Sequence, residues 1–227
     1  MAEPSKITIK TRLPVGLIPP NLERAQIKTE RLVIRPYTQD DLAGMHVLRT
    51  QPEVMHFTMR GCIDQNLAET QERLDWYLPP RDLESYNWAI CLAETGEQVG
   101  MGGVNRLKAN GQTGWPEVGY MFKREHWGKG YATEFLRAFL DAWWTLERSE
   151  VELEVDARSV DGIVDGAQAV AIPDRVTAIV DANNRGSLRV MEKAGFRQYK
   201  QFVEADSRMG YEGKDITLVG FIRSKET

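Results

Sequence analysis

Two hydrophobic periods share this chain and predict a structure of mixed strands and helices. Period-two alternation, or a short apolar run bounded by turn residues, is typical of strands. It predicts strands over residues 31–37, 88–93, 98–107, 115–122, 151–155, 175–181, 196–202 and 215–222. Short turns at Gly96 and at Asn110-Gly111 separate the second, third and fourth of these, which indicates an antiparallel meander.

Helical spacing of apolar residues predicts four helices. The first begins at Thr38, a capping residue followed by Asp40 and Asp41, whose charges suit the positive end of a helix. The second runs from about Asp64 until Pro79 ends it. Apolar side chains recurring every three or four residues predict the other two, over 130–146 and 187–194.

The chain divides into an arm and one domain. Residues 1–27 contain several prolines and no sustained hydrophobic period, so we expect an N-terminal arm that lies on the domain or is partly disordered. Residues 28–227 then form a single domain. Within it, a polar stretch over about 147–174 with two Asp-Gly pairs is expected to be an insertion, either a hairpin or an ordered loop. No internal repeat is present, which favours one α+β domain.

Composition excludes several classes of protein. The 227 residues carry 29 Lys and Arg against 33 Asp and Glu, a net charge of −4 that argues against nonspecific nucleic-acid binding. No apolar run approaches the roughly 18 residues of a membrane helix, and the N-terminus lacks the pattern of a secretory signal. Two cysteines, Cys62 and Cys91, form no disulfide framework, and three scattered histidines indicate no metal site. We therefore expect a cytoplasmic protein without a metal.

The segment from Glu117 to Glu134 has the order strand, glycine-containing turn, helix. Such a turn directs several backbone N–H groups to one point beside the positive end of the helix dipole, so it suits a phosphate group. Gly128 and Gly130 let a ligand approach the backbone without a Cβ in the way, and Lys129 adds a cation. A tight turn that binds nothing is the alternative that this segment alone leaves open.

Two familiar phosphate motifs do not fit this turn. A dinucleotide fingerprint requires a third glycine three residues after Gly130, where Thr133 stands. A Walker loop requires Ser or Thr directly after the lysine, where Gly130 stands. Binding of an ordinary nucleotide is therefore disfavoured, although it stays a competing hypothesis.

A second segment, from Asp181 to Phe196, completes a pattern that resembles the GNAT superfamily of acyl-CoA-dependent N-acetyltransferases. The likeness is greatest to its Rim-type branch, which is related to ribosomal-protein N-terminal acetyltransferases, and it covers about residues 28–222. The motifs are Glu117-x-Gly119-Tyr120, then Trp127-Gly128-Lys129-Gly130-Tyr131-Ala132-Thr133-Glu134, then Asn184-x-x-Ser187 continuing to Glu192-Lys193-x-Gly195-Phe196. The resemblance implies the GNAT fold of the α+β class: a central mixed, mostly antiparallel sheet, flanking helices, and a splayed strand pair that binds acyl-CoA.

The resemblance also implies a cofactor site for acetyl-CoA as the acyl donor, with no metal. The matching positions are Met121, Phe122, Lys123, Trp127, Gly128, Lys129, Gly130, Tyr131, Ala132, Thr133, Asn184 and Ser187. Glu125 departs from the pattern, which has Gln or Arg there, so the cation facing the phosphates is expected to be Lys129 or Arg124. A glycine inside a strand, Gly119, is consistent with a bulge.

Acetyl transfer requires a neutral amine and a proton for the departing thiolate. The resemblance points to Ser187 as the acid and to Asn184 as a hydrogen-bonding group for the acyl-CoA arm, although capping of the last helix would explain Asn184 equally. We favour Glu117 as the base, directly or through water, because a carboxylate in a partly closed cleft can have a raised pKa. A merely solvated glutamate is the alternative. Tyr120 is expected in the core, and His126 is disfavoured as a base because it lies inside the turn.

The sequence thus predicts an N-acetyltransferase of the acyltransferase class. The acceptor is a primary amine, either a small molecule or a peptide N-terminus, and neither a nucleic acid nor a membrane is an expected partner. Trp88, Trp115 and Trp127 could line the acceptor pocket, with core packing as the alternative for each. A noncatalytic acyl-CoA-binding or scaffold domain is the competing function. The oligomeric state stays open, with a homodimer among the options.

Overall fold

A computed structural model describes residues 6–105, 113–160 and 170–225. The strands in these residues are β1 (Lys6–Leu13), β2 (Ile27–Lys28), β3 (Leu32–Arg35), β4 (Tyr86–Leu92), β5 (Gln98–Val104), β6 (Val118–Phe122), β7 (Ser149–Asp156), β8 (Val170–Ala171), β9 (Arg175–Asp181), β10 (Arg197–Ala205) and β11 (Asp215–Ser224). The α-helices are α1 (Leu42–Arg49), α2 (Pro52–Met55), α3 (Leu67–Asp75), α4 (Tyr131–Thr145) and α5 (Arg185–Lys193). The predicted turn at Asn110-Gly111 and the two Asp-Gly pairs of the insertion lie outside the described residues.

The predicted meander is confirmed as β4, β5 and β6, the last three strands of a five-stranded antiparallel sheet in the order β2-β3-β4-β5-β6. Gly102 of β5 lies between Trp88 and Tyr120 on the neighbouring strands. A Cβ at Gly102 would stand only 2.7 Å from the ring of Phe135. The missing side chain therefore lets α4 pack close against the middle of this sheet.

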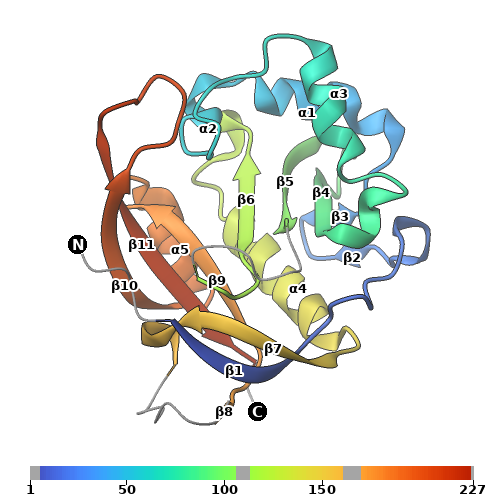
Figure 1. Cartoon of the computed structure of the whole chain (residues 1–227). Helices are drawn as coiled ribbons and strands as arrows, with labels where there is room; N and C mark the ends of the chain where they lie inside the picture. Colours follow the sequence, from blue (N-terminus) through green and yellow to red (C-terminus); the bar gives the residue numbers. More distant parts are fainter. Residues whose placement is uncertain (1–5, 106–112, 161–169, 226–227) are drawn as a thin grey trace.

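A second antiparallel sheet, in the order β10-β11-β9, meets the first sheet along β6 and β9. The two strands run parallel and share a single bridge, between Glu117 and Thr177. Beyond this bridge they diverge toward their C-terminal ends (Figure 1). The splayed strand pair predicted from the family resemblance is thus present, and we call the space between β6 and β9 the gap.

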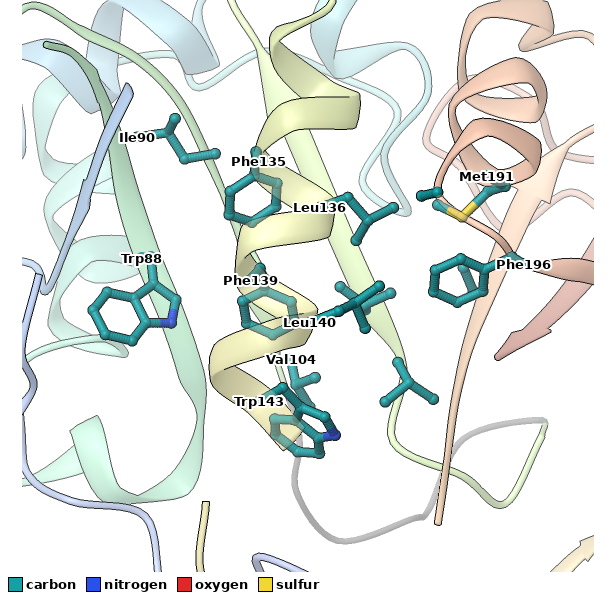
Figure 2. Packing of buried hydrophobic residues seen from close by; sticks show 14 of the residues in the cluster. Trp88, Ile90, Val104, Phe135, Leu136, Phe139, Leu140, Trp143, Met191 and Phe196 are labelled. Atoms are coloured by element: carbon teal, nitrogen blue, oxygen red, sulfur yellow. The ribbon is translucent and has the colours of Figure 1, made fainter. Parts of the chain in front are cut away.

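The helix predicted with the most regular period forms the centre of the main hydrophobic core. Figure 2 shows α4 with its apolar side chains between the first sheet and the segment that carries Met191 and Phe196. The fully buried side chains of this helix are Phe135, Leu136, Phe139, Leu140 and Trp143. With 15 residues it is the longest helix described, and none of the helices in the described residues has the length and apolar character needed to span a bilayer.

The helices α1, α2 and α3 precede β4, and α1 packs against β5. Thr38 and Asp41 make the reciprocal capping interaction that starts the first one, and Asn66 caps α3 by accepting from the Glu69 N–H. The short helix α2 was not anticipated, because only Pro52 at its first position marks it in the sequence. It carries the chain to the C-terminal end of β6, near the loop between β10 and β11 (Figure 1).

The N-terminal arm contains a strand that the sequence interpretation missed. Residues 6–13 alternate polar and apolar positions and pair along their whole length with β7, which lies inside the predicted insertion. Ile9 and Leu13 are fully buried by this pairing. The arm and the insertion therefore form one small sheet, β7-β1-β8, and part of the arm belongs to the packed structure.

Candidate active site

The turn between β6 and α4 has the backbone conformation that its glycines predict. Gly128 and Gly130 adopt φ values of +74° and +85°, which side chains with a Cβ rarely adopt. Gly130 is the N-cap of α4 and provides no side-chain cap, and the first intrahelical bond runs from the Glu134 N–H to the Gly130 carbonyl at 3.1 Å. The N–H groups of the first turn therefore have no intrahelical acceptor and are free to bind an anion.

The two cations that the sequence predicts beside the phosphates, Lys129 and Arg124, differ in their surroundings. Lys129 is exposed and can reach a bound phosphate, whereas the Arg124 guanidinium stacks 5.0 Å from the centre of the Trp127 ring. The Glu125 carboxylate, at the position where the family pattern has Gln or Arg, accepts from Gln51 at 3.0 Å. Gln51 also accepts from the Arg124 N–H at 2.7 Å, so the segment before α2 holds the first half of the turn.

The register of β6 decides which backbone groups face the gap. The Lys123 N–H donates to Val99 on the β5 side, and its ammonium group binds Glu97 at 2.8 Å, so Lys123 turns away from the gap. Because alternate residues of a strand bond to the same neighbour, the Met121 backbone also faces β5. The N–H and C=O groups of Tyr120 and Phe122 therefore face the gap, and the indole of Trp127 already binds the Phe122 carbonyl at 2.7 Å.

The bulge predicted at Gly119 is wrong. The register between β5 and β6 runs without a shift from Gly100–Phe122 to Val104–Val118. A Cβ at Gly119 would meet only the side-chain amide of Asn105, at 3.9 Å. The glycine therefore leaves free space on one face of a regular strand.

Asn184 and Ser187 lie together at the start of α5. The Asn184 side chain accepts from the Ser187 N–H at 3.0 Å, which confirms the capping interpretation of Asn184. The Ser187 hydroxyl lies near Tyr120, whose own hydroxyl is buried and has no hydrogen-bond partner among the described residues. Burial raises the pKa of Tyr120 to about 12, with a smaller opposing effect from Ser187. As predicted, the Tyr120 ring packs in the core, edge-on to Phe135.

Glu117 stands at the closed end of the gap, where β6 and β9 make their bridge. Removal of water from its carboxylate raises the pKa of Glu117 to about 7, and the nearby Lys200 ammonium opposes this shift. Lys200 is itself buried and bound to Asp156 at 3.2 Å. A glutamate with this pKa can accept a proton near neutral pH, so the environment suits the role inferred from the sequence.

Two loops meet at the open end of the gap. Arg208, in the loop between β10 and β11, binds Asp181 at the end of β9 at 3.3 Å and donates to the His56 carbonyl at 2.9 Å. The Tyr211 hydroxyl lies 2.9 Å from Nδ1 of the same histidine, and the Met209 N–H donates to the Arg60 carbonyl. Sequence reasoning gave no sign of this rim, because its partners are about 150 residues apart.

The remaining candidate residues are placed as follows. Trp88 and Trp115 are almost fully buried, which confirms core packing for both, while Trp127 is 37% exposed beside the turn. His126 lies in the turn, where one ligand atom each from Glu97, Glu125 and His126 falls within 4.8 Å of the others. The carboxylate of Glu97 in this group also accepts from the Lys123 ammonium at 2.8 Å.

A groove of about 560 Å³ lies on the other side of the turn. Gly130 and Thr133 form its edge, and its cations are Arg31, Arg137 and Lys193. Sequence reasoning missed Arg31 because it lies about 100 residues before the turn.

Glu117 imposes a pH-dependent cost on stability. Its pKa is raised in the folded protein from 4.5 to about 7, so the folded state binds the proton more tightly than the unfolded state. Wild-type stability should then fall as the pH rises from about 4.5 to 7. Partial exposure of Glu117 to water reduces the effect on the free energy of unfolding. We therefore expect Glu117→Gln to be more stable than wild type at pH 8 by on the order of 2 kcal/mol, with little difference near pH 4.

Urea denaturation at both pH values measures this effect. The exposed Glu147→Gln is the matched control and should change stability equally little at pH 4 and pH 8. Equal stability of Glu117→Gln and wild type at pH 8 would mean that the carboxylate is well solvated.

Comparison with known proteins agrees with this geometry. The family model of the acetyltransferase (GNAT) domain matches residues 31–197. The Bacillus subtilis protein YkkB is 30% identical over 181 residues, which cover 78% of this chain and 88% of YkkB.

Solved structures show the same fold at lower identity. A GNAT-family acetyltransferase from Bacillus anthracis has a TM-score of 0.62 at 20% identity, covering 88% of this chain and 98% of its own. The microcin C7 self-immunity acetyltransferase MccE, solved with acetyl-CoA and AMP, has a TM-score of 0.61 at 10% identity, covering 87% and 94%. The ribosomal-protein-S5-alanine acetyltransferase of Vibrio fischeri has a TM-score of 0.58 at 10% identity, covering 89% and 98%. From its sequence match and its fold, this chain belongs to the GNAT family of acetyltransferases.

Proposed function

We propose that this protein transfers an acetyl group from acetyl-CoA to a primary amine by direct attack. The observation that carries the proposal is the gap between β6 and β9, which has a glycine turn with free backbone N–H groups at its open end and the desolvated Glu117 at its closed end. A thioester donor with a phosphate-bearing handle fits these two ends. Its motifs lead us to propose that the protein belongs to the Rim-type branch. Because Cys62 and Cys91 are both free, we also propose that it works in the cytoplasm.

The diphosphate of the cofactor is proposed to bind the backbone N–H groups of residues 128–133, with Lys129 as a nearby cation. The pantetheine arm then enters the gap and bonds to the strand edge that Tyr120 and Phe122 present. This arrangement places the thioester beside the start of α5, where Asn184 and Ser187 lie. Trp127 shields the junction between the turn and the gap, because its indole is bound to the Phe122 carbonyl.

The amine is proposed to reach the thioester from the Glu117 end of the gap. Tyr120 lies three positions after Glu117, a distance of about 10 Å along an extended chain at 3.3 Å per residue, which leaves room for an amine and a thioester in line. Glu117 takes a proton from the ammonium group, directly or through water, and the neutral nitrogen attacks the carbonyl carbon. The C–N bond forms, the C–S bond breaks, and the electron pair leaves on sulfur.

Ser187 is proposed to give its proton to the departing thiolate, and the second proton that the amide nitrogen releases then restores the Ser187 hydroxyl through water. The Ser187 backbone N–H is bound by the Asn184 side chain, which fixes the position of this residue at the start of α5. The unpartnered Tyr120 hydroxyl next to it can donate a hydrogen bond to Ser187 as its charge develops. Neither group requires a metal, and we propose none.

Cofactor binding is the first test of this function. Gly130→Asp should weaken CoA binding at least a hundredfold in calorimetry, because it forces a Cβ into a φ of +85° and places a carboxylate beside the diphosphate. Gly16→Asp is the matched control, since Gly16 has a similar φ of +74° with open space around it, and it should bind CoA normally. Equal affinity of the two variants would place the phosphates elsewhere.

The pH dependence of turnover tests the base. Glu117 must be ionised to take the proton of a bound ammonium group, so kcat/KM of wild type should fall tenfold per pH unit below about pH 7 and stay level from there up to the pKa of the acceptor amine. Glu117→Gln should lower kcat and remove this level region, because only the neutral amine then reacts. Thiol release from acetyl-CoA with a panel of amines is the measurement, and an unaltered profile would assign the proton to another group. CoA binding with no turnover on any amine would favour the noncatalytic alternative.

The acid is tested by Ser187→Ala. We expect kcat to fall at least tenfold while CoA affinity in calorimetry stays within about twofold, because the hydroxyl acts on the thiolate that exists only during the reaction. Ser149→Ala, at an exposed serine of β7, is the control and should leave both quantities unchanged. Wild-type turnover in Ser187→Ala would exclude this residue as the acid.

A further inference from the structure

Arg31 connects the hairpin formed by β2 and β3 to the glycine turn between β6 and α4. It lies between β2 and β3, in a turn closed by the Leu32 N–H donating to the Thr29 hydroxyl at 2.9 Å. Its own carbonyl accepts from the Ala93 N–H at 2.9 Å. The backbone of Arg31 is thus fixed on two sides, and its side chain projects from a rigid support.

The guanidinium of Arg31 makes contacts on three residues around the turn. Its Nε and Nη2 bind one carboxylate oxygen of Glu134, at 2.8 and 2.6 Å, and Nη1 donates to the Lys129 carbonyl at 3.0 Å. The group also lies over the Tyr131 ring, 4.7 Å from its centre. The other Glu134 oxygen accepts from the Thr29 hydroxyl and from the Arg31 N–H. This network of four hydrogen bonds, one ion-pair contact and one cation–π contact differs from an ordinary surface ion pair, which contributes little.

The bond to the Lys129 carbonyl sets the direction of a neighbouring N–H group. In a planar trans peptide the C=O and the N–H point in opposite directions. With the Lys129 carbonyl held by Arg31, the Gly130 N–H points away from Arg31. Glycine on either side of Lys129 would otherwise let this peptide rotate, because Gly128 and Gly130 are the least restricted residues of the turn.

We propose that Arg31 and Glu134 are positioning residues for the diphosphate turn: together they hold the peptide between Lys129 and Gly130 and the first turn of α4 in the orientation that receives the cofactor. The inference rests on the proposed function, since it assumes that this turn binds CoA. Arg31 acts through the turn, and Glu134 acts through Arg31.

The direction in which Glu134→Gln changes the affinity for CoA distinguishes positioning from simple charge attraction. Glu134 is an anion in the first turn of α4, close to the expected diphosphate. If only charge mattered, Glu134→Gln would remove a repulsion and would tighten CoA binding or leave it unchanged. If positioning matters, the same change releases Arg31 and loosens the turn, and CoA binding weakens.

The experiment is a double-mutant cycle with Arg31→Met, Glu134→Gln and both, measured as the Kd of CoA by calorimetry. We expect Arg31→Met to raise Kd about tenfold and Glu134→Gln at least threefold. The double variant should be no weaker than Arg31→Met alone, because the two residues act as one unit. Hydrogen exchange of the amides over 128–133 in the free protein should accelerate in both single variants. With acetyl-CoA, KM should rise while kcat stays within twofold.

Arg35→Met provides the control. Arg35 lies at the other end of β3 and makes a similar pair with Asp41, at 2.6 Å, so it reports the general cost of losing such a pair. It should leave the Kd of CoA and the exchange of residues 128–133 unchanged. Equal or tighter CoA binding by Glu134→Gln, while wild type still binds CoA, would overturn the positioning role alone. Failure of wild type to bind CoA would instead overturn the proposed function.

Discussion

The single backbone bridge between β6 and β9 is the constraint on which the rest of the site depends. The Thr177 N–H donates to the Pro116 carbonyl at 2.9 Å, directly before Glu117. Proline has no N–H to give in return, so the ladder does not extend on that side. On the other side the strands diverge, and each keeps one edge of backbone N–H and C=O groups that is not bonded to the other. Such groups are costly to bury without partners, so a ligand that bonds to both edges is stabilised there.

The same bridge determines the chemistry of the closed end. It places Glu117 at the junction of the two sheets, where partial burial raises the pKa of its carboxyl group. Lys200 comes from a register shift in β10, and Gly220 opposite it leaves space for its side chain, since a Cβ there would lie 2.6 Å from Lys200 Cγ. A buried ammonium is thereby supplied near a carboxylate that would otherwise bind its proton still more tightly. At neutral pH the fold is therefore less stable than it would be with a solvated carboxylate at this position, and the proposed base titrates in the same pH range.

Local patterns in the sequence were sufficient to predict most of the fold. The strands and helices were found because each buries one face against the core, which imposes a period that neighbouring residues carry by themselves. The strand Lys6–Leu13 alternates, but several prolines follow it and its partner lies about 140 residues away. The local sequence therefore does not identify it as part of a sheet. Gly119 was predicted as a bulge, but a glycine in a strand marks free space as readily as a kink. The glycine turn and the α5 cap were predictable because their geometry is local, whereas Arg31, Lys200 and the Arg208 rim were not, because each acts on residues distant in the sequence.

The two sides of the gap are supported by different parts of the structure, and for this reason the proposed donor side is easier to predict from the sequence than the proposed acceptor side. The turn and α5 are held by the ends of regular elements packed on the α4 core, so their geometry follows from the fold. The rim at the open end is built from two loops that contact each other through His56, Arg208 and Tyr211. Loops can change without disturbing a core, and binding specificity therefore tends to reside in them. A family that shares one donor and differs in its acceptors is the expected outcome of this division.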